Sequence, residues 1–172
     1  MTVEDRNAIA LALTGDQGAY TVLITRYKHM VHTVTSRVLR NEMDAQEATQ
    51  DVFVKAFRQL AEFQGAGKFS TWLYSIAYRT AISALGRRKE DTLSLDAVPP
   101  RSEFSMDAPM PAHDRTAILE QALATLAPED AAIVTMFYLE EMSVQEIVTV
   151  TGIGASNVKV KLHRSRKKLF DA

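Results

Sequence analysis

The segment 65–70 (GAGKFS) contains the glycines, lysine and serine that cradle phosphate groups in nucleotide-binding enzymes. A phosphate loop of that kind needs the spacing G-x-x-x-x-G-K-[ST], because its backbone amides and its lysine must meet the same phosphates. Here Glu62 occupies the position of the first glycine, and Phe69 follows the lysine where a hydroxyl residue is required. The segment therefore does not predict nucleotide hydrolysis.

Two histidines are the other candidates for reactive chemistry. His29 and His32 are three residues apart in a helical pattern, and this spacing could place both on one face toward a metal ion. No paired-carboxylate motif accompanies them, so ordinary helix histidines are the favoured interpretation. No Ser/His/Asp or Cys/His set is recognisable, and the chain has no cysteine. The sequence therefore predicts a protein that is not an enzyme and has no catalytic residue, metal site or cofactor.

Charge is unevenly distributed along the chain. The formal net charge is only −1, yet residues 155–172 contain six basic residues and the single acid Asp171. A second basic cluster covers residues 87–89, and acidic residues gather at 42–51 and at 90–107. Two basic patches on a nearly neutral chain indicate local contact with a polyanion. Two solvated helix ends would give the same composition, and charge alone does not decide between the two interpretations.

The chain divides at a stretch rich in proline. Its 172 residues suit one domain or two small ones. Residues 90–113 contain four prolines and have neither a helical nor an alternating pattern, which predicts an acidic linker between two domains. No run of eighteen apolar residues and no basic, apolar leader is visible, so we expect no membrane insertion and no secretion. The lack of cysteine is compatible with a cytoplasmic location.

Before the linker, apolar residues recur at helical spacing. One stripe predicts a first helix that starts after Asp16, and a second stripe predicts a helix over about 44–60. Residues 63–68 are predicted to form a loop, and Ser70 can cap a third helix. The two stripes consist of Ala19, Leu23, Tyr27 and Val31, and of Ala48, Val52, Ala56 and Leu60.

Helical signals also follow the linker. An amphipathic helix is predicted from Ile118 to Leu126, and Pro128 suits the first turn of the next one. The pair Ser143-x-x-Glu146 is a capping-box signature that opens a short helix. No segment alternates in the manner of a strand. The predicted fold class is therefore all-α, with two small helical domains joined by a flexible linker.

The end of the chain has the pattern of a helix-turn-helix. A capped helix of about eight residues, the glycine-containing turn 151–154 and a long basic helix follow one another. In that motif the second helix lies in the major groove, where Lys and Arg suit guanine edges and Val a thymine methyl. A basic helix that merely balances its own dipole is the alternative. The residues expected at base edges are Lys159, Val160, His163 and Arg164, and those expected at phosphates are Ser156, Asn157, Lys161, Arg166 and Lys167.

Four segments together resemble the extracytoplasmic-function (ECF) class of bacterial RNA polymerase sigma factors. Residues 126–169 resemble the promoter-binding fourth region, and residues 15–27, 44–57 and 68–82 resemble successive parts of the second region. The resemblance implies a second-region domain at 1–89, the linker at 90–113 and a fourth-region domain at 114–172. It further implies promoter-specific transcription initiation, in a stress or envelope-signal regulon.

The resemblance assigns the −10 element to the loop and helix after residue 63. Opening a promoter requires a surface of aromatic and cationic side chains that holds unstacked single-stranded DNA. Core packing is the alternative for the aromatic residues, and it is favoured for Phe69 and for part of Trp72. The residues expected to contact the −10 element are Gln64, Lys68, Ser70, Thr71, Trp72, Tyr74, Arg79, Ser83, Arg87 and Arg88.

The resemblance also implies the partners. The acidic helix would dock on the clamp helices of core RNA polymerase, and the fourth region would meet its flap, while the linker would run toward the active site and the RNA exit path. A solvated acidic face is the alternative for that helix. An anti-sigma factor is expected to hold the protein inactive. The expected polymerase-binding residues are Asp44, Glu47, Gln50, Asp51, Phe53, Val54 and Lys55.

A conventional regulator with a sensory domain before its helix-turn-helix is the remaining class of protein. The motifs of the N-terminal half argue against it, because they resemble elements that open DNA and dock on polymerase. The two classes differ in one simple respect. A sigma factor copurifies with core polymerase, whereas a conventional regulator binds its operator alone.

Overall fold

The computed structural model of the chain describes residues 2–63, 65, 67–94 and 115–170. These residues contain helices and no strand, which confirms the all-α fold class. The elements run in the order α1 (Val3–Leu13), α2 (Gln17–Leu39), α3 (Glu42–Arg58), the 3₁₀ turn η1 (Leu60–Glu62), α4 (Phe69–Ser94), α5 (Arg115–Ala124), α6 (Pro128–Tyr138), α7 (Val144–Thr151) and α8 (Ala155–Phe170).

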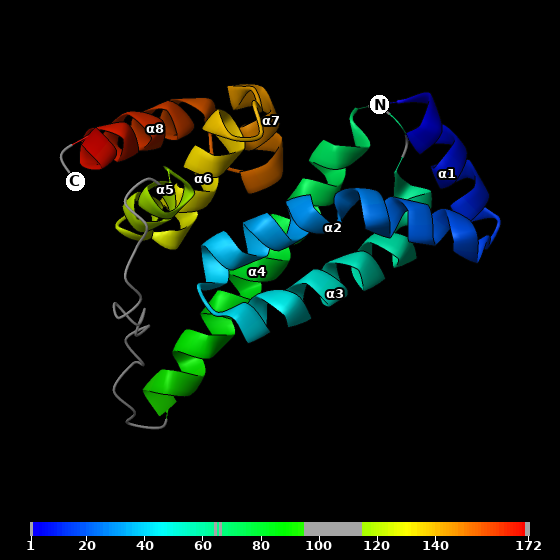
Figure 1. Ribbon diagram of the computed structural model, residues 1–172, viewed down its shortest axis with the longest axis horizontal. Helices are drawn as coiled ribbons and strands as arrows, with labels where there is room; N and C mark the ends of the chain where they lie inside the picture. Colours follow the sequence, from blue (N-terminus) through cyan, green and yellow to red (C-terminus); the bar gives the residue numbers. More distant parts are fainter. Residues whose placement is uncertain (1, 64, 66, 95–114, 171–172) are drawn as a thin grey trace.

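The N-terminal unit, α1 to α4, is built around the mutual packing of α2, α3 and α4 (Figure 1). The predicted stripes form its core, as their four-residue spacing requires. Leu23 and Val31 are buried on α2, while Tyr27 between them is only half-buried. On the second stripe Ala48, Val52, Ala56 and Leu60 are all buried.

Helix α1 is an element that the sequence analysis did not predict. It begins with a capping box, in which the Thr2 hydroxyl accepts from the Asp5 amide and the Asp5 carboxylate accepts from the Thr2 amide. Arg26 on α2 pairs with the buried Asp5 at 2.7 Å and also with Glu4. These contacts hold α1 against α2.

Local caps set the helix boundaries. The Asp16 carboxylate accepts from the Ala19 amide at 2.8 Å, which confirms Asp16 as the start signal of α2. Asn41 caps α3, which begins at Glu42, two residues before the predicted start. Helix α4 begins at Phe69 and continues to Ser94, so residues 90–94 are helical, and the prediction that they belong to an irregular linker is wrong. The remainder of the predicted linker lies outside the described residues.

The C-terminal unit, α5 to α8, contains the helix-turn-helix. Pro128 occupies the first turn of α6, where its missing N–H has no intrahelical partner to lose. The predicted capping box of Ser143 and Glu146 opens α7. Gly152 ends α7 with φ of 74°, a left-handed conformation that favours glycine. Helix α8 starts three residues later and packs on α6 and α7.

The two units also contact each other. Helix α7 packs on α4, and α6 packs on α2, so the helix-turn-helix lies against the N-terminal end of α4. Figure 1 shows α6 and α7 beside the crossing of α2 and α4. None of the helices in the described part of the chain combines the length and apolar character that a membrane span requires.

Candidate functional site

The outer face of α8 carries the residues predicted at base edges. Val158 and Leu162 are buried against the rest of the unit, and they fix which side of the helix faces outward. The residues on the opposite side, Lys159, Val160, His163 and Arg164, are all exposed. Ser156 and Asn157 in the first turn are exposed as well, and so are Arg166 and Lys167 farther along.

Lys161 has a different environment from the other cations of α8. It is half-buried, and its Nζ lies 2.6 Å from the Asp130 carboxylate on α6. Lys161 is predicted from the sequence at a phosphate, but the structure gives it an intramolecular partner. This ion pair ties α8 to α6.

The aromatic residues at the start of α4 are largely core residues. Phe69, Tyr74 and Tyr78 are buried, and Trp72 is half-buried. The rings of Phe63, Phe69 and Trp72 form a cluster with centroid separations of 5.3 to 5.5 Å. Tyr74 is predicted from the sequence on a DNA-binding surface, whereas the structure buries its ring between the two units. Among the aromatics predicted at the −10 element, Trp72 retains an accessible edge, and its neighbour Phe63 is half-buried as well.

The polar residues predicted at the −10 element fall into two groups on α4. Lys68 is exposed at the helix start, and Ser70 and Thr71 are half-buried beside it, while Gln64 lies outside the described residues. Farther along α4, Arg79, Ser83 and Arg87 are exposed on one face of the helix, as their four-residue spacing predicts.

Arg88 was predicted to contact DNA with this second group. It is half-buried, and its guanidinium donates to the Leu39 carbonyl at 3.4 Å and to the Asp44 carboxylate at 3.2 Å. These contacts tie α4 to the end of α2 and the start of α3. Arg88 therefore has a structural role in the N-terminal unit, and Asp44, predicted at polymerase, is its ion-pair partner.

Helix α3 presents an acidic face that also exposes two apolar residues, Met43 and Val54. Glu47, Gln50 and Asp51 are exposed. Both Phe53 and Val54 are predicted from the sequence at polymerase, and the structure distinguishes the two: Val54 is 48% exposed, whereas Phe53 is 7% exposed and packs in the core. Lys55 donates to the Thr80 hydroxyl on α4 at 3.2 Å and so belongs to the inner side.

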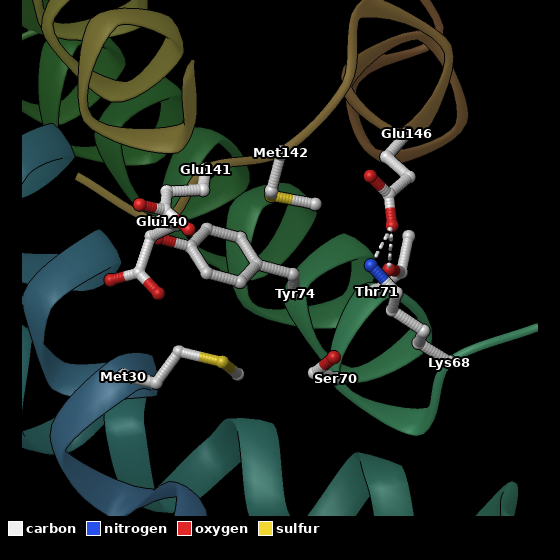
Figure 2. Close-up of a pocket in the computed structure, with 9 residues that line it drawn as sticks. All are labelled: Met30, Lys68, Ser70, Thr71, Tyr74, Glu140, Glu141, Met142 and Glu146. Carbon is white, nitrogen blue, oxygen red and sulfur yellow. Dashed lines mark hydrogen bonds and ion pairs between the residues drawn. The ribbon is translucent and has the colours of Figure 1, made fainter. Parts of the chain in front are cut away.

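Glu146 is a residue whose second role sequence reasoning missed. Its carboxylate accepts from the Ser143 amide at 2.9 Å as part of the predicted capping box. It also lies 3.0 Å from the Lys68 ammonium and accepts from the Thr71 hydroxyl at 3.3 Å, so it joins α7 to α4 (Figure 2). These partners are 78 and 75 positions away, and no local pattern could have revealed them.

The environment of Glu146 predicts a pH dependence. The Ser143 amide and the Lys68 ammonium lower its pKa from the ordinary 4.5 to about 2. A lowered pKa means that the charged form stabilises the fold above pH 4.5, and that this contribution is lost as the pH falls toward 2. We expect the stability advantage of the wild type over Glu146→Gln to be constant above pH 4.5 and to vanish near pH 2 in denaturant titrations.

The amide of Gln keeps the capping box, so this variant removes the charge alone. Glu62→Gln, at an exposed glutamate of η1, controls for the general loss of one negative charge. An advantage of the wild type over Glu146→Gln that persisted unchanged at pH 2 would contradict the assignment.

Comparison with known proteins supports the resemblance. Residues 23–90 match the family model of sigma-70 region 2, and residues 116–169 match that of sigma-70 region 4. The ECF RNA polymerase sigma-E factor of Escherichia coli is 30% identical over 90% of this chain and 86% of its own length. The RNA polymerase sigma-H factor of Pseudomonas aeruginosa is 27% identical over 98% of this chain and 93% of its own.

A solved structure gives the same fold. The sigma factor RpoE from Bartonella quintana, determined in complex with the anti-sigma factor NepR, superposes with a TM-score of 0.75. It covers 88% of this chain and 94% of that one at 16% sequence identity. The matches to both sigma regions, the all-helical fold and a relative that is 30% identical over 90% of this chain point to the same family. The chain belongs to the ECF sigma factors, the non-catalytic proteins that direct RNA polymerase to promoters and start transcription there.

Proposed function

We propose that the two units act on two parts of one promoter. Residues 114–172 read the double-stranded −35 element through the outer face of α8, and residues 1–89 bind core polymerase and hold the melted −10 element. The observation that carries this proposal is the exposed face of α8, where Lys159, Val160, His163 and Arg164 follow directly on the glycine turn. Exposed cations and one apolar side chain near the start of a recognition helix suit base edges in the major groove.

The −10 surface is assigned to α4. We use this name for Lys68, Ser70, Thr71, Trp72, Arg79, Ser83 and Arg87, which are exposed or half-buried. Cations and hydroxyls can bind the backbone of a single strand, and an aromatic edge can stack on an unpaired base. Gln64 is kept in the proposal through the family resemblance alone.

The polymerase docking face is assigned to α3. We use this name for Glu47, Gln50, Asp51 and Val54, all exposed. A central apolar residue surrounded by acids suits a basic partner, because the charges orient the encounter and the apolar contact supplies affinity. The partner proposed for this face is the clamp helices of core polymerase, with the C-terminal unit on the flap. The protein would then act in the cytoplasm, where polymerase acts.

The direct test is transcription in vitro. Core polymerase together with this protein should initiate at promoters that core polymerase alone ignores, because the chain carries both promoter-reading regions. Genome-wide run-off transcription read by sequencing measures this and also defines the regulon, which we expect to serve a stress or envelope signal. If no promoter responded, the proposed function would be wrong.

An anti-sigma factor is the third proposed partner. The sigma factor from Bartonella quintana with the same fold was solved bound to one. In this chain, an anti-sigma factor that covered the exposed face of α8 and the docking face of α3 would prevent both from acting. Affinity capture of the chain from uninduced cells should recover such an inhibitor in addition to polymerase. Recovery of polymerase alone would count against this partner.

A further inference from the structure

Trp72 is the aromatic residue of the −10 surface, and its indole packs on neighbouring rings. The ring centroid of Phe69, one turn earlier on α4, is 5.5 Å from that of Trp72, and the centroid of Phe63 is 5.3 Å from it. Phe63 and Phe69 are themselves 5.4 Å apart, edge to face. Aromatic pairs prefer separations and tilts of this kind. The orientation of the indole therefore depends on where these two rings are held.

Tyr27 of α2 extends the cluster to a second helix. Its ring meets that of Phe69 with centroids 5.3 Å apart and planes inclined at 63°. Phe69 is only 1% exposed and contacts both Tyr27 and Trp72, so it has little room to turn while the Tyr27 ring is in place. Without that ring Phe69 would border a cavity and could adopt other rotamers, and the support of Trp72 would change with it.

The turn of α2 that carries Tyr27 is fixed by α1. Arg26, its neighbour in sequence, pairs with the buried Asp5 at 2.7 Å. The Tyr27 hydroxyl interacts with the same carboxylate: burial, and then hydrogen bonding to Asp5, raises the pKa of Tyr27 to about 12. Asp5 is itself held by Arg26 and by the Thr2 amide. Tyr27 is thus fixed by α1 at its hydroxyl and by Phe69 at its ring.

We infer that Tyr27 is a positioning residue for Trp72: its ring holds Phe69, and Phe69 together with Phe63 holds the indole in the orientation that stacks on an unpaired base. The inference rests on the proposed role of Trp72 at the −10 element. A side chain that is already ordered loses less conformational freedom when it binds. Tyr27 has no proposed contact with DNA or polymerase, so its effect on promoter opening passes through Trp72.

The mobility of Trp72 can be measured directly, because it is the only tryptophan of the chain. Time-resolved fluorescence anisotropy of the full-length protein reports how freely the indole moves. In the wild type the indole should move only with the whole protein, whereas Tyr27→Leu should add a component in the picosecond-to-nanosecond range of side-chain rotation. Tyr27→Phe keeps the ring and should behave as the wild type does. An indole as rigid in Tyr27→Leu as in the wild type would overturn the inference.

Tyr20→Leu is a matched control for this measurement. Tyr20 is also half-buried on α2, and its ring packs on Phe57 of α3 with centroids 4.4 Å apart. The substitution removes the same kind of ring from the same helix, so it should lower the denaturant midpoint similarly and yet leave Trp72 rigid. Added motion of Trp72 in Tyr20→Leu as well would contradict a specific role of Tyr27. Tyr27→Met, with an unbranched and flexible side chain, repeats the test if Tyr27→Leu does not fold.

Promoter opening supplies a second measurement. With core polymerase bound, at a promoter found by run-off transcription, the reactivity of unpaired thymines to permanganate gives the equilibrium constant for opening. Tyr27→Leu should lower this constant about fivefold, the effect of having to immobilise one more side chain on binding. Tyr27→Phe and Tyr20→Leu should leave it unchanged.

A double variant tests whether Tyr27 acts through Trp72. In a chain that already carries Trp72→Ala, Tyr27→Leu should not reduce promoter opening further, because two residues that act as one unit are not additive. A further fivefold loss in that chain would overturn the inference, as would wild-type opening by Trp72→Ala alone.

Failure of this inference and failure of the proposed function give different results. If the wild type initiated at no promoter, the proposed function would be wrong, although the motion of Trp72 could still be measured. If the wild type initiated and Tyr27→Leu opened promoters equally well, the inference would be wrong and the proposed function would stand.

Discussion

Replacing Val54 by aspartate should weaken binding of the chain to core polymerase about 30-fold, the effect expected of a central contact residue in an interface. Val54 is 48% exposed on the docking face of α3, surrounded by Glu47, Gln50 and Asp51. An aspartate there would remove the apolar contact and bury an additional charge at the centre of the interface. Titration of labelled protein with core polymerase measures the change.

Val22→Asp is a matched control for this variant. Val22 lies on α2, outside the docking face, and is 49% exposed, so the same substitution has the same solvent exposure there. We expect Val22→Asp to bind polymerase as the wild type does, and both variants to unfold at wild-type denaturant concentrations. Equal binding by the Val54 variant and the wild type would place the docking face elsewhere on the N-terminal unit.

Replacing Arg164 by alanine should change which −35 sequences the polymerase complex prefers. Arg164 lies one turn after Val160 on the exposed face of α8, near the middle of the recognition helix. A good two-pronged contact with a guanine edge discriminates by about 1–3 kcal/mol, so the preference at one base pair should be lost. Competition among promoters with single-base changes, with the variant bound to polymerase, measures this loss.

Lys167→Ala is the control for Arg164→Ala. Lys167 is exposed too, but it lies about two turns beyond Val160. At that distance a helix that lies in the major groove has left the base edges and runs beside the DNA backbone, so Lys167 should contact a phosphate. Its loss should weaken binding to all promoter sequences alike. It should also reduce the slope of log affinity against log salt concentration by about one unit. A uniform loss of affinity in Arg164→Ala would show that Lys159 or His163 reads the base instead.

The sequence predicted the elements whose signals are local. Four-residue apolar spacing located α2 and α3, and the pair Ser143 and Glu146 located the start of α7, because a capping box needs only residues within one turn. Helix α1 has a signal of the same kind in Thr2 and Asp5, although no helix was predicted there. The continuation of α4 to residue 94 was missed because the polar composition there resembles that of the linker that follows.

The roles of individual site residues depend on contacts that no local pattern contains. Lys161 resembles its basic neighbours in sequence, yet Asp130 on another helix removes it from the exposed face of α8. Adjacent residues on a helix point in directions about 100° apart, so Val54 and Phe53 cannot share one environment. Val54 lies opposite the buried stripe of α3, whereas Phe53 lies at the edge of that stripe and packs in the core. Tyr74 is buried because the second unit covers it, and that contact depends on both units together.

The double role of Glu146 has a consequence for how far the two units depend on each other. Its bonds to the Ser143 amide and hydroxyl lie entirely within the helix-turn-helix, whereas its bond to Lys68 reaches the N-terminal unit. The capping box that opens α7 is therefore complete within the C-terminal unit and needs no donor from α4. The fold of the DNA-reading motif and its contact with α4 are separate properties of the chain, although one carboxylate takes part in both.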